Sequence, residues 1–245
     1  MVNISPIAPT RNIAAFSGLV TRLITRRPDV PGLGCFYGRA GLGKSKAATF
    51  GANMARATYV ECNQFTTAKS LLLRILSEMG VHKAKGSVPD LLDLATERMA
   101  MDPSRLLIID EAHWIAHKRF IDIARALHDL SRAPIILIGE EMLPTALETH
   151  DRVHSRILEW VEASPCNLED MMHLIRIRAP GLVLAPELIN LLLDRTRGNA
   201  RRIVVNLADI VEESRRLGVN KIGLDQYDAA RIRVHKAPTV VRRAV

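Results

Sequence analysis

The sequence lacks a long apolar run, a signal-like N-terminus and a paired set of cysteines. None of its apolar runs reaches about eighteen residues, so no membrane-spanning helix is expected. Residues 1–20 mix proline and polar residues among the apolar ones, which is not the pattern of a signal peptide. Cys35, Cys62 and Cys166 are far apart and odd in number, which argues against a disulfide or zinc framework. These absences favour a reduced, cytoplasmic protein with no membrane partner.

Aromatic residues are also scarce, at 4% of 245 residues, whereas hydrophobic residues make up 48%. The core must therefore be mainly aliphatic. This length accommodates one large domain, or a large and a small one.

Positive charge is concentrated at the two ends of the chain. Residues 1–27 carry +4 and residues 195–245 carry +7, which leaves −3 of the net +8 to the middle. Basic ends around a mildly acidic centre indicate a polyanionic partner, most plausibly nucleic acid, although a solvated basic surface remains the alternative.

Residues 38–45 match the phosphate-binding pattern G-x-x-x-x-G-K-[ST], between an apolar run at 33–37 and a helical pattern at 45–57. In such a loop the glycines let backbone N–H groups face the phosphates, and the helix dipole adds positive potential. We expect Lys44 to reach the β- and γ-phosphates and Ser45 to ligate Mg²⁺. The nucleotide-contacting set is Gly38, Arg39, Ala40, Gly41, Leu42, Gly43, Lys44, Ser45 and Lys46.

A second motif, Asp110-Glu111-Ala112-His113, follows four aliphatic residues at 106–109. Such a run predicts a strand buried on both faces of a parallel sheet, with the acids at its carboxyl end, where open α/β sheets bind ligands. We expect Asp110 to hold Mg²⁺, directly or through water, and Glu111 to polarise the attacking water. His113 and His117 are four residues apart, but no third metal ligand stands out.

Apolar periodicity predicts the remaining elements. Strands are expected at 58–62, 134–139 and 157–163. Helices are expected at 13–24, 68–79, 89–101, 117–131, 142–148, 168–177, 186–196, 200–217 and 224–234. The expected organisation is an N-terminal extension (1–30), an α/β subdomain (31–165), an all-helical subdomain (166–234) and a basic tail (235–245).

Two phosphate and metal motifs followed by a helical segment resemble the AAA+ ATPases, whose fold is a P-loop domain with a parallel five-stranded sheet and a helical lid. Gly198-Asn199-Ala200-Arg201 resembles the sensor 2 motif, which implies that Arg201 reaches the γ-phosphate. Arg152 and Arg156 resemble the segment that supplies an arginine finger to the ATP of a neighbouring subunit, and the Ser155-Arg156 pair favours Arg156. One departure is Glu140 at the sensor 1 position, where the family carries Asn, Gln or Thr; either the alignment shifts by one residue or hydrolysis is slow.

Within this family, the sequence around 110–113 and 135–139 is similar to the transposition regulators, which include the Mu phage transposition protein B and the Tn7 and Tn5053 target-selection ATPases. The resemblance implies a homo-oligomer that binds ATP at subunit interfaces, coats duplex DNA without sequence preference, and directs a transposase. Candidate DNA-contacting residues are Thr67, Lys69, Lys83, Lys85, Lys118 and Arg119. A helicase loader, a secretion-associated ATPase and a nucleotide-dependent scaffold with little hydrolysis remain alternatives. A helicase is disfavoured because no second nucleotide-binding-like half follows.

Overall fold

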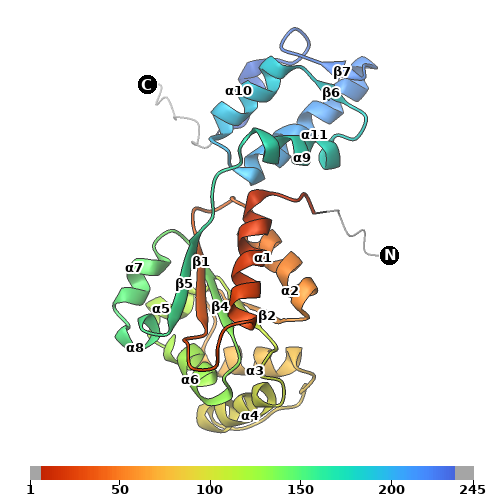
Figure 1. Ribbon diagram of the computed structural model, residues 1–245. Helices are drawn as coiled ribbons and strands as arrows, with labels where there is room; N and C mark the ends of the chain where they lie inside the picture. Colours follow the sequence, from red (N-terminus) through yellow and green to blue (C-terminus); the bar gives the residue numbers. More distant parts are fainter. Residues whose placement is uncertain (1–6, 235–245) are drawn as a thin grey trace, which may run out of the picture. The chain divides into compact units, whose positions relative to one another are not determined.

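The computed structural model describes residues 7–234, which divide into two compact units (Figure 1). The larger unit spans Asn12–Ser164, and the smaller one combines residues 165–234 with residues 7–11. Each unit has its own cluster of buried hydrophobic residues. The expected basic tail at 235–245 lies outside the described residues.

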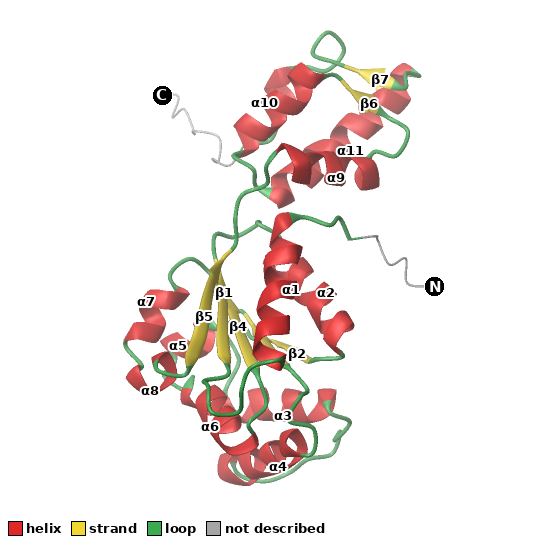
Figure 2. Cartoon of the chain, in the orientation of Figure 1, coloured by secondary structure: helices red, strands yellow, loops and turns green. Residues whose placement is uncertain are grey.

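The larger unit alternates strands and helices, as Figure 2 shows. Its strands are β1 (Leu33–Tyr37), β2 (Thr58–Glu61), β3 (Leu107–Asp110), β4 (Ile135–Gly139) and β5 (Ile157–Glu162). Its helices are α1 (Arg11–Ile24), α2 (Lys44–Ala55), α3 (Ala68–Glu78), α4 (Val88–Ala100), α5 (His113–His117), α6 (Asp122–Ser131), α7 (Leu143–Glu148) and α8 (Asp151–His154).

The five strands form one parallel sheet in the order β2-β3-β4-β1-β5. β1 is therefore flanked by β4 and β5, and β3 lies between β2 and β4. Because all strands run the same way, the ends of β1 and β3 lie at the same edge of the sheet, where both sequence motifs begin. This topology confirms the expected parallel five-stranded α/β fold.

Helices cover both faces of the sheet. Successive side chains along a strand point to opposite faces, so alternate residues of each strand contact different helices. On one face α1 packs against β1: the rings of Phe16 and Phe36 lie 5.2 Å apart, edge to face. A Cβ at Gly34 would come within 2.7 Å of the Leu23 side chain in α1, which would then have to shift, so glycine suits this close approach. On the other face, Cys35 and Ile109 join the aliphatic cluster that α3, α4 and α6 complete. α1 therefore belongs to the core of the sheet unit, rather than to a separate extension ending at residue 30.

The helix expected over residues 117–131 is confirmed only from Asp122 onward, because α6 spans Asp122–Ser131 and His117 is the last residue of the separate helix α5. Arg119 adopts a left-handed φ of 60°, which ends α5 and separates it from α6. Phe120 N–H instead bonds to the Ile115 carbonyl, so the chain turns before α6 begins. The short helix α8 was not predicted.

The smaller unit consists of three helices, two short strands and one helical turn. Its elements are α9 (Leu168–Arg178), β6 (Val183–Leu184), α10 (Pro186–Thr196), α11 (Ala200–Leu217), β7 (Lys221–Ile222) and the 3-10 turn η1 (Ala229–Arg231). The β6–β7 pair is parallel and corrects the all-helical expectation. None of the helices within residues 7–234 is both long and apolar enough to cross a bilayer.

The helix expected over residues 224–234 is also wrong. The Asn206 side chain donates to the Arg233 carbonyl at 3.1 Å and accepts from the Arg233 N–H at 2.8 Å. Tyr227, almost fully buried, donates its hydroxyl proton to Asp209 at 2.6 Å. Because backbone and side-chain groups of residues 224–234 bond to α11, the segment adopts a different conformation and forms only a single 3-10 turn.

Candidate nucleotide-binding site

Three glycines shape the loop between β1 and α2. Gly38, Gly41 and Gly43 have φ angles of 147°, 84° and 91°, where a side chain would strain the backbone. A Cβ at Gly43 would meet nothing within 4 Å, so that position requires glycine for its conformation and not for space. α2 begins directly after Gly43, and its first N–H groups have no partner within the helix. The loop and the helix N-terminus together suit a phosphate group.

Lys44, the first residue of α2, points its ammonium group into this loop. It is only 7% exposed, and its Nζ donates to the carbonyls of Gly38 at 2.6 Å and Arg39 at 3.0 Å. An ammonium group has three donors, so one remains for an incoming acceptor. Desolvation lowers the pKa of Lys44, while the carboxylates of Glu111 and Asp110 act against that shift. The phosphate loop and the acidic motif are therefore close enough to influence each other.

Asp110 ends β3 and is completely buried. Its Oδ1 accepts a hydrogen bond from the Glu111 N–H at 2.8 Å, and its Oδ2 accepts one from the Tyr59 hydroxyl at 2.9 Å. Tyr59 comes from β2, the neighbouring edge strand. Burial, and then the charge of Asp110, raise the pKa of the Tyr59 phenol, which stays protonated as the donor. Both donors are neutral, so neither compensates the negative charge of the carboxylate.

Glu111 follows Asp110 in a left-handed conformation with a φ of 55°, which is uncommon for a residue with a side chain. Desolvation and the charge of Asp110 raise its pKa, although Lys44 opposes them. A raised pKa makes this carboxylate a stronger base towards water. Its Oε2 lies 3.3 Å from His113 Nδ1, and desolvation lowers the pKa of His113. The imidazole is therefore neutral at pH 7, and the contact is not an ion pair.

Glu140 and Glu141 follow the last residue of β4 and are both exposed. Glu140 raises the pKa of Glu111, and Glu141 lies 3.7 Å from the Arg39 guanidinium. The position expected to hold a neutral sensor 1 side chain therefore carries a carboxylate close to the site. With Asp110 and Glu111 it makes the region around Lys44 acidic.

The donor set suits a hard divalent cation. The Ser45 hydroxyl, exposed in the first turn of α2, and the Asp110 carboxylate offer the oxygen atoms that Mg²⁺ prefers. Within residues 7–234 no group of three or more His, Cys, Asp or Glu could hold a metal by itself. A cation here would therefore complete its shell with phosphate oxygens and water. Lys46, also exposed, lies one residue further along α2.

Asn12 is a residue of this site that sequence reasoning missed. Its side-chain amide donates to the carbonyl of Leu42 in the phosphate loop at 2.9 Å and to the carbonyl of Ser164 at 2.8 Å. Its Oδ1 accepts from the Ser164 N–H at 2.8 Å. α1 thus connects the phosphate loop to the segment that follows β5. A single asparagine near the start of a helix offers no sequence signal for such a role.

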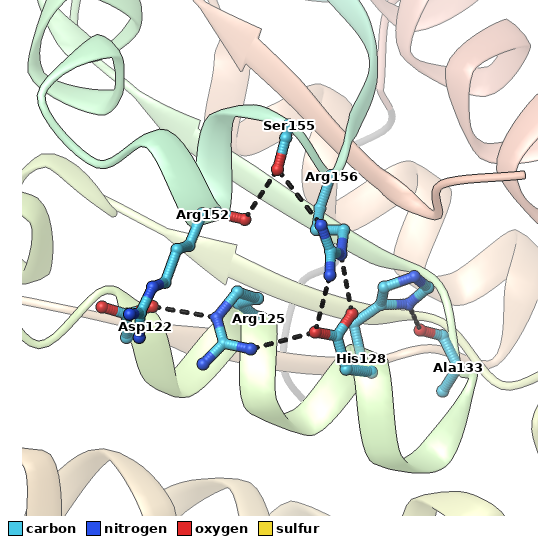
Figure 3. Close-up of polar contacts among 8 residues, drawn as sticks. Asp122, Arg125, His128, Ala133, Arg152, Ser155 and Arg156 are labelled. Carbon is cyan, nitrogen blue, oxygen red and sulfur yellow. Dashed lines mark hydrogen bonds and ion pairs between the residues drawn. The ribbon is translucent and has the colours of Figure 1, made fainter.

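Arg156, the expected arginine finger, is paired within its own chain (Figure 3). Its Nε and Nη2 donate to the Asp129 carboxylate at 3.0 and 3.4 Å, and its Nη1 donates to the Ser155 hydroxyl at 3.2 Å. Arg125 also donates to Asp129, at 3.0 Å. Burial alone would raise the pKa of Asp129, but the hydrogen bonds from Arg156 and Arg125 outweigh it, and the pKa is lowered. A surface pocket of about 560 Å³ beside this cluster is lined by Arg125, Asp151, Arg152, Ser155 and Arg156.

Arg201, the expected sensor 2 residue, is an exposed residue in the first turn of α11 in the smaller unit. Gly198 precedes the helix with a φ of 65°, and a Cβ there would lie 2.6 Å from the Cys166 carbonyl. Asn199 caps the helix by accepting from the Arg202 N–H at 3.1 Å. Gly198 therefore allows the tight turn before α11, and Asn199 caps the helix.

Two of the expected DNA-contacting residues make hydrogen bonds within the chain. Lys118 Nζ donates to the carbonyls of Gln64 and Thr66, so it holds the loop after β2. The Thr67 hydroxyl caps α3 by accepting from the Ser70 N–H. All six candidates are exposed, including the remaining four, Lys69, Lys83, Lys85 and Arg119.

Comparisons with known proteins agree with this geometry. Residues 26–147 match the family described as AAA domain. No curated protein sequence matches the chain.

Solved structures resemble the chain over most of its length at low identity. The Aeropyrum pernix ORC2 protein in its ADP form is 18% identical, with a TM-score of 0.66 over 92% of this chain and 69% of that one. The Aeropyrum pernix ORC1 protein in complex with DNA is 17% identical, with a TM-score of 0.58 over 94% and 67%. Domain III of the Thermotoga maritima replication initiation protein DnaA is 16% identical, with a TM-score of 0.55 over 89% and 90%. The chain therefore has the AAA+ P-loop fold, with an AAA domain at residues 26–147.

Proposed function

We propose that the protein binds ATP with Mg²⁺ and hydrolyses it. The observation that carries this proposal is the meeting of Lys44, Asp110 and Glu111 at one edge of the sheet, beside a loop with three left-handed glycines. The ADP form of the similar ORC2 structure agrees with a nucleotide ligand.

Each side chain has a distinct part in this reaction. The loop amides and Lys44 bind the β- and γ-phosphates, and Lys44 stabilises the charge that develops on them. Ser45 and Asp110 hold Mg²⁺, which neutralises phosphate charge when bound. Glu111 accepts a proton from the attacking water. We also propose Arg201 as the sensor 2 residue that contacts the γ-phosphate, and Arg156 as the arginine finger for the ATP of a neighbouring copy.

We further propose duplex DNA and a second copy of this chain as partners. The net charge of +8 and the basic ends support a polyanion, and the similar ORC1 structure is a complex with DNA. Lysine contacts to phosphates add affinity and salt dependence without sequence preference. The finer role that we propose is regulation of transposition through a transposase. The similarity to DnaA domain III favours a second candidate, a role in replication initiation.

Nucleotide binding is tested by titrating a fluorescent ATP analogue into the wild type, Lys44→Ala and Lys221→Ala. Removing a hydrogen-bond donor that carries charge costs about 1.5–3 kcal/mol, so Lys44→Ala should weaken binding roughly 10- to 150-fold. Lys221 is exposed in β7 and serves as the matched control. Equal affinity of the Lys44→Ala variant and the wild type would contradict the proposal.

DNA competition separates the two finer roles. If the protein is a transposition regulator that coats DNA, any unlabelled duplex of the same length should displace a labelled duplex equally well. If the protein is a replication initiator, unrelated unlabelled duplex should displace a labelled duplex that carries its origin sequence less well than unlabelled origin duplex does. Binding that does not weaken with added salt would contradict DNA as a partner in either role.

A further inference from the structure

Tyr59 touches the acidic motif from a different strand. β2 pairs in parallel with β3, so that Glu61 lies opposite Asp110 and Tyr59 opposite Ile108. Side chains two residues apart on a strand share a face, so Tyr59 and Asp110 lie on the same face, one diagonal step apart. This step is short enough for a phenol to reach the carboxylate, and the two oxygens are 2.9 Å apart.

The hydrogen bonds to Asp110 fix the orientation of its carboxylate. The backbone N–H of Glu111 holds Oδ1 and the Tyr59 hydroxyl holds Oδ2, so rotation of the carboxylate would break one bond or both. Each carboxylate oxygen has two lone pairs, and one on each oxygen remains for a cation or a cation-bound water. Because both donors are neutral, they orient the group without cancelling its charge.

The burial of Asp110 makes this support necessary. The carboxylate is fully buried, and a buried charge without hydrogen-bond partners is strongly unfavourable. The Glu111 amide belongs to the motif itself, and within residues 7–234 the side-chain donor to Asp110 is Tyr59.

We propose that Tyr59 is a positioning residue of the divalent-cation site, which it serves by holding the Asp110 carboxylate in the orientation that binds Mg²⁺. The inference rests on the proposed binding of Mg²⁺–ATP at this site. Residues that orient a metal ligand from outside the coordination shell typically contribute about 10- to 100-fold to metal affinity.

The chain contains a matched control for this hydrogen bond. Tyr227 in the smaller unit donates its hydroxyl proton to the Asp209 carboxylate at 2.6 Å. Tyr59→Phe and Tyr227→Phe therefore remove the same chemical group from the same type of pair. Only the first pair includes an expected Mg²⁺ ligand.

The test is a Mg²⁺ titration of fluorescent ATP-analogue binding, which needs no turnover. For Tyr59→Phe, the Mg²⁺ concentration at half-maximal enhancement of binding should rise about 10- to 100-fold. Binding in EDTA should stay as in the wild type, and Tyr227→Phe should match the wild type throughout. In the Asp110→Asn background, Tyr59→Phe should cause little further change, because it acts through Asp110.

A wild-type Mg²⁺ dependence in Tyr59→Phe would overturn the inference, provided that the wild type itself requires Mg²⁺ and thermal unfolding shows both variants folded. An equal loss in Tyr59→Phe and Tyr227→Phe would also overturn it, because it would indicate a general loss of stability. Failure of the proposed function looks different: Lys44→Ala would then bind nucleotide as well as the wild type.

Discussion

Two buried or half-buried aspartates of the larger unit are held in opposite ways. Asp110 accepts hydrogen bonds from a phenol and a backbone amide, which are both neutral. Asp129 accepts hydrogen bonds from the guanidinium groups of Arg125 and Arg156, which are both charged. The charge of Asp129 is thus balanced by two guanidinium groups, whereas the hydrogen-bond donors of Asp110 leave its charge uncompensated, as its proposed role as a Mg²⁺ ligand requires. The charge of the donors therefore distinguishes the proposed cation ligand Asp110 from Asp129, which forms ion pairs within the chain.

The largest effect concerns Arg156, which must leave Asp129 if it acts on a neighbouring copy. Arg156→Ala and Glu111→Gln should each lower ATP turnover roughly 10²- to 10⁴-fold, in the range of a lost general base or a lost transition-state contact. Mixing the two variants creates some interfaces with both residues intact, so turnover should partly return. The measurement is steady-state phosphate release at several mixing ratios, with Arg27→Ala, an exposed arginine, as the control for Arg156→Ala.

If turnover stays low at every ratio although both variants fold and bind ATP, Arg156 does not act in trans. Its pairing with Asp129 would then be its main role.

A second prediction concerns pH and the residue beside Asp129 in α6. Desolvation lowers the pKa of His128, which is buried; the hydrogen bond with the Ala133 carbonyl acts against this shift, and the nearby Arg26 charge adds to it. Below about pH 6.5 the unfolded chain binds this proton more readily than the folded one, so the free energy of unfolding should fall as the pH falls. Denaturant unfolding at pH 5 to 8 should show a weaker pH dependence for His128→Gln than for the wild type.

The control substitution for this experiment is His82→Gln, which replaces an exposed histidine with the same side chain. His113, whose pKa is also lowered by desolvation, should leave some pH dependence in His128→Gln. Identical slopes for His128→Gln and the wild type would contradict the prediction.

The smallest effect is expected for Asp129→Asn. The side chains of Arg156 and Asp129 are 41% and 26% exposed, so water screens the pair, and the free energy of unfolding should fall by less than about 1 kcal/mol. Chemical denaturation measures this loss, and Asp122→Asn, which spares the bonds to Asp129, is the control. A loss above about 3 kcal/mol would mean that the pair behaves like a buried one.

Much of the fold and part of the site follow from the sequence because their signals are local. Residues 38–45 and 110–111 carry their chemistry in adjacent positions, and the aliphatic runs of β3 and β4 predict buried parallel strands. Tyr59 could not be linked to Asp110 in this way, because their contact depends on the register between two strands far apart in the sequence.

The missed features share this dependence on distant contacts. The apolar periodicity from Phe120 onward predicts a helix that begins near His117, but the left-handed backbone at Arg119 delays the start of α6 to Asp122. The segment at 224–234 has helical periodicity, but Asn206 and Asp209 of α11 bind it in another conformation. The bonding of Arg156 to Asp129 likewise joins residues 27 positions apart.

Asn12 has a mechanical consequence. One planar amide binds Leu42 in the phosphate loop and both backbone groups of Ser164, the last residue of the larger unit. Because the amide group is planar and rigid, its three hydrogen bonds fix the position of Leu42 relative to Ser164. If the loop shifts as phosphate enters or leaves, these hydrogen bonds would have to stretch or break, or Ser164 would have to move with the loop. The Asn12 side chain thus links the phosphate loop to Ser164, the residue at which the polypeptide leaves the larger unit.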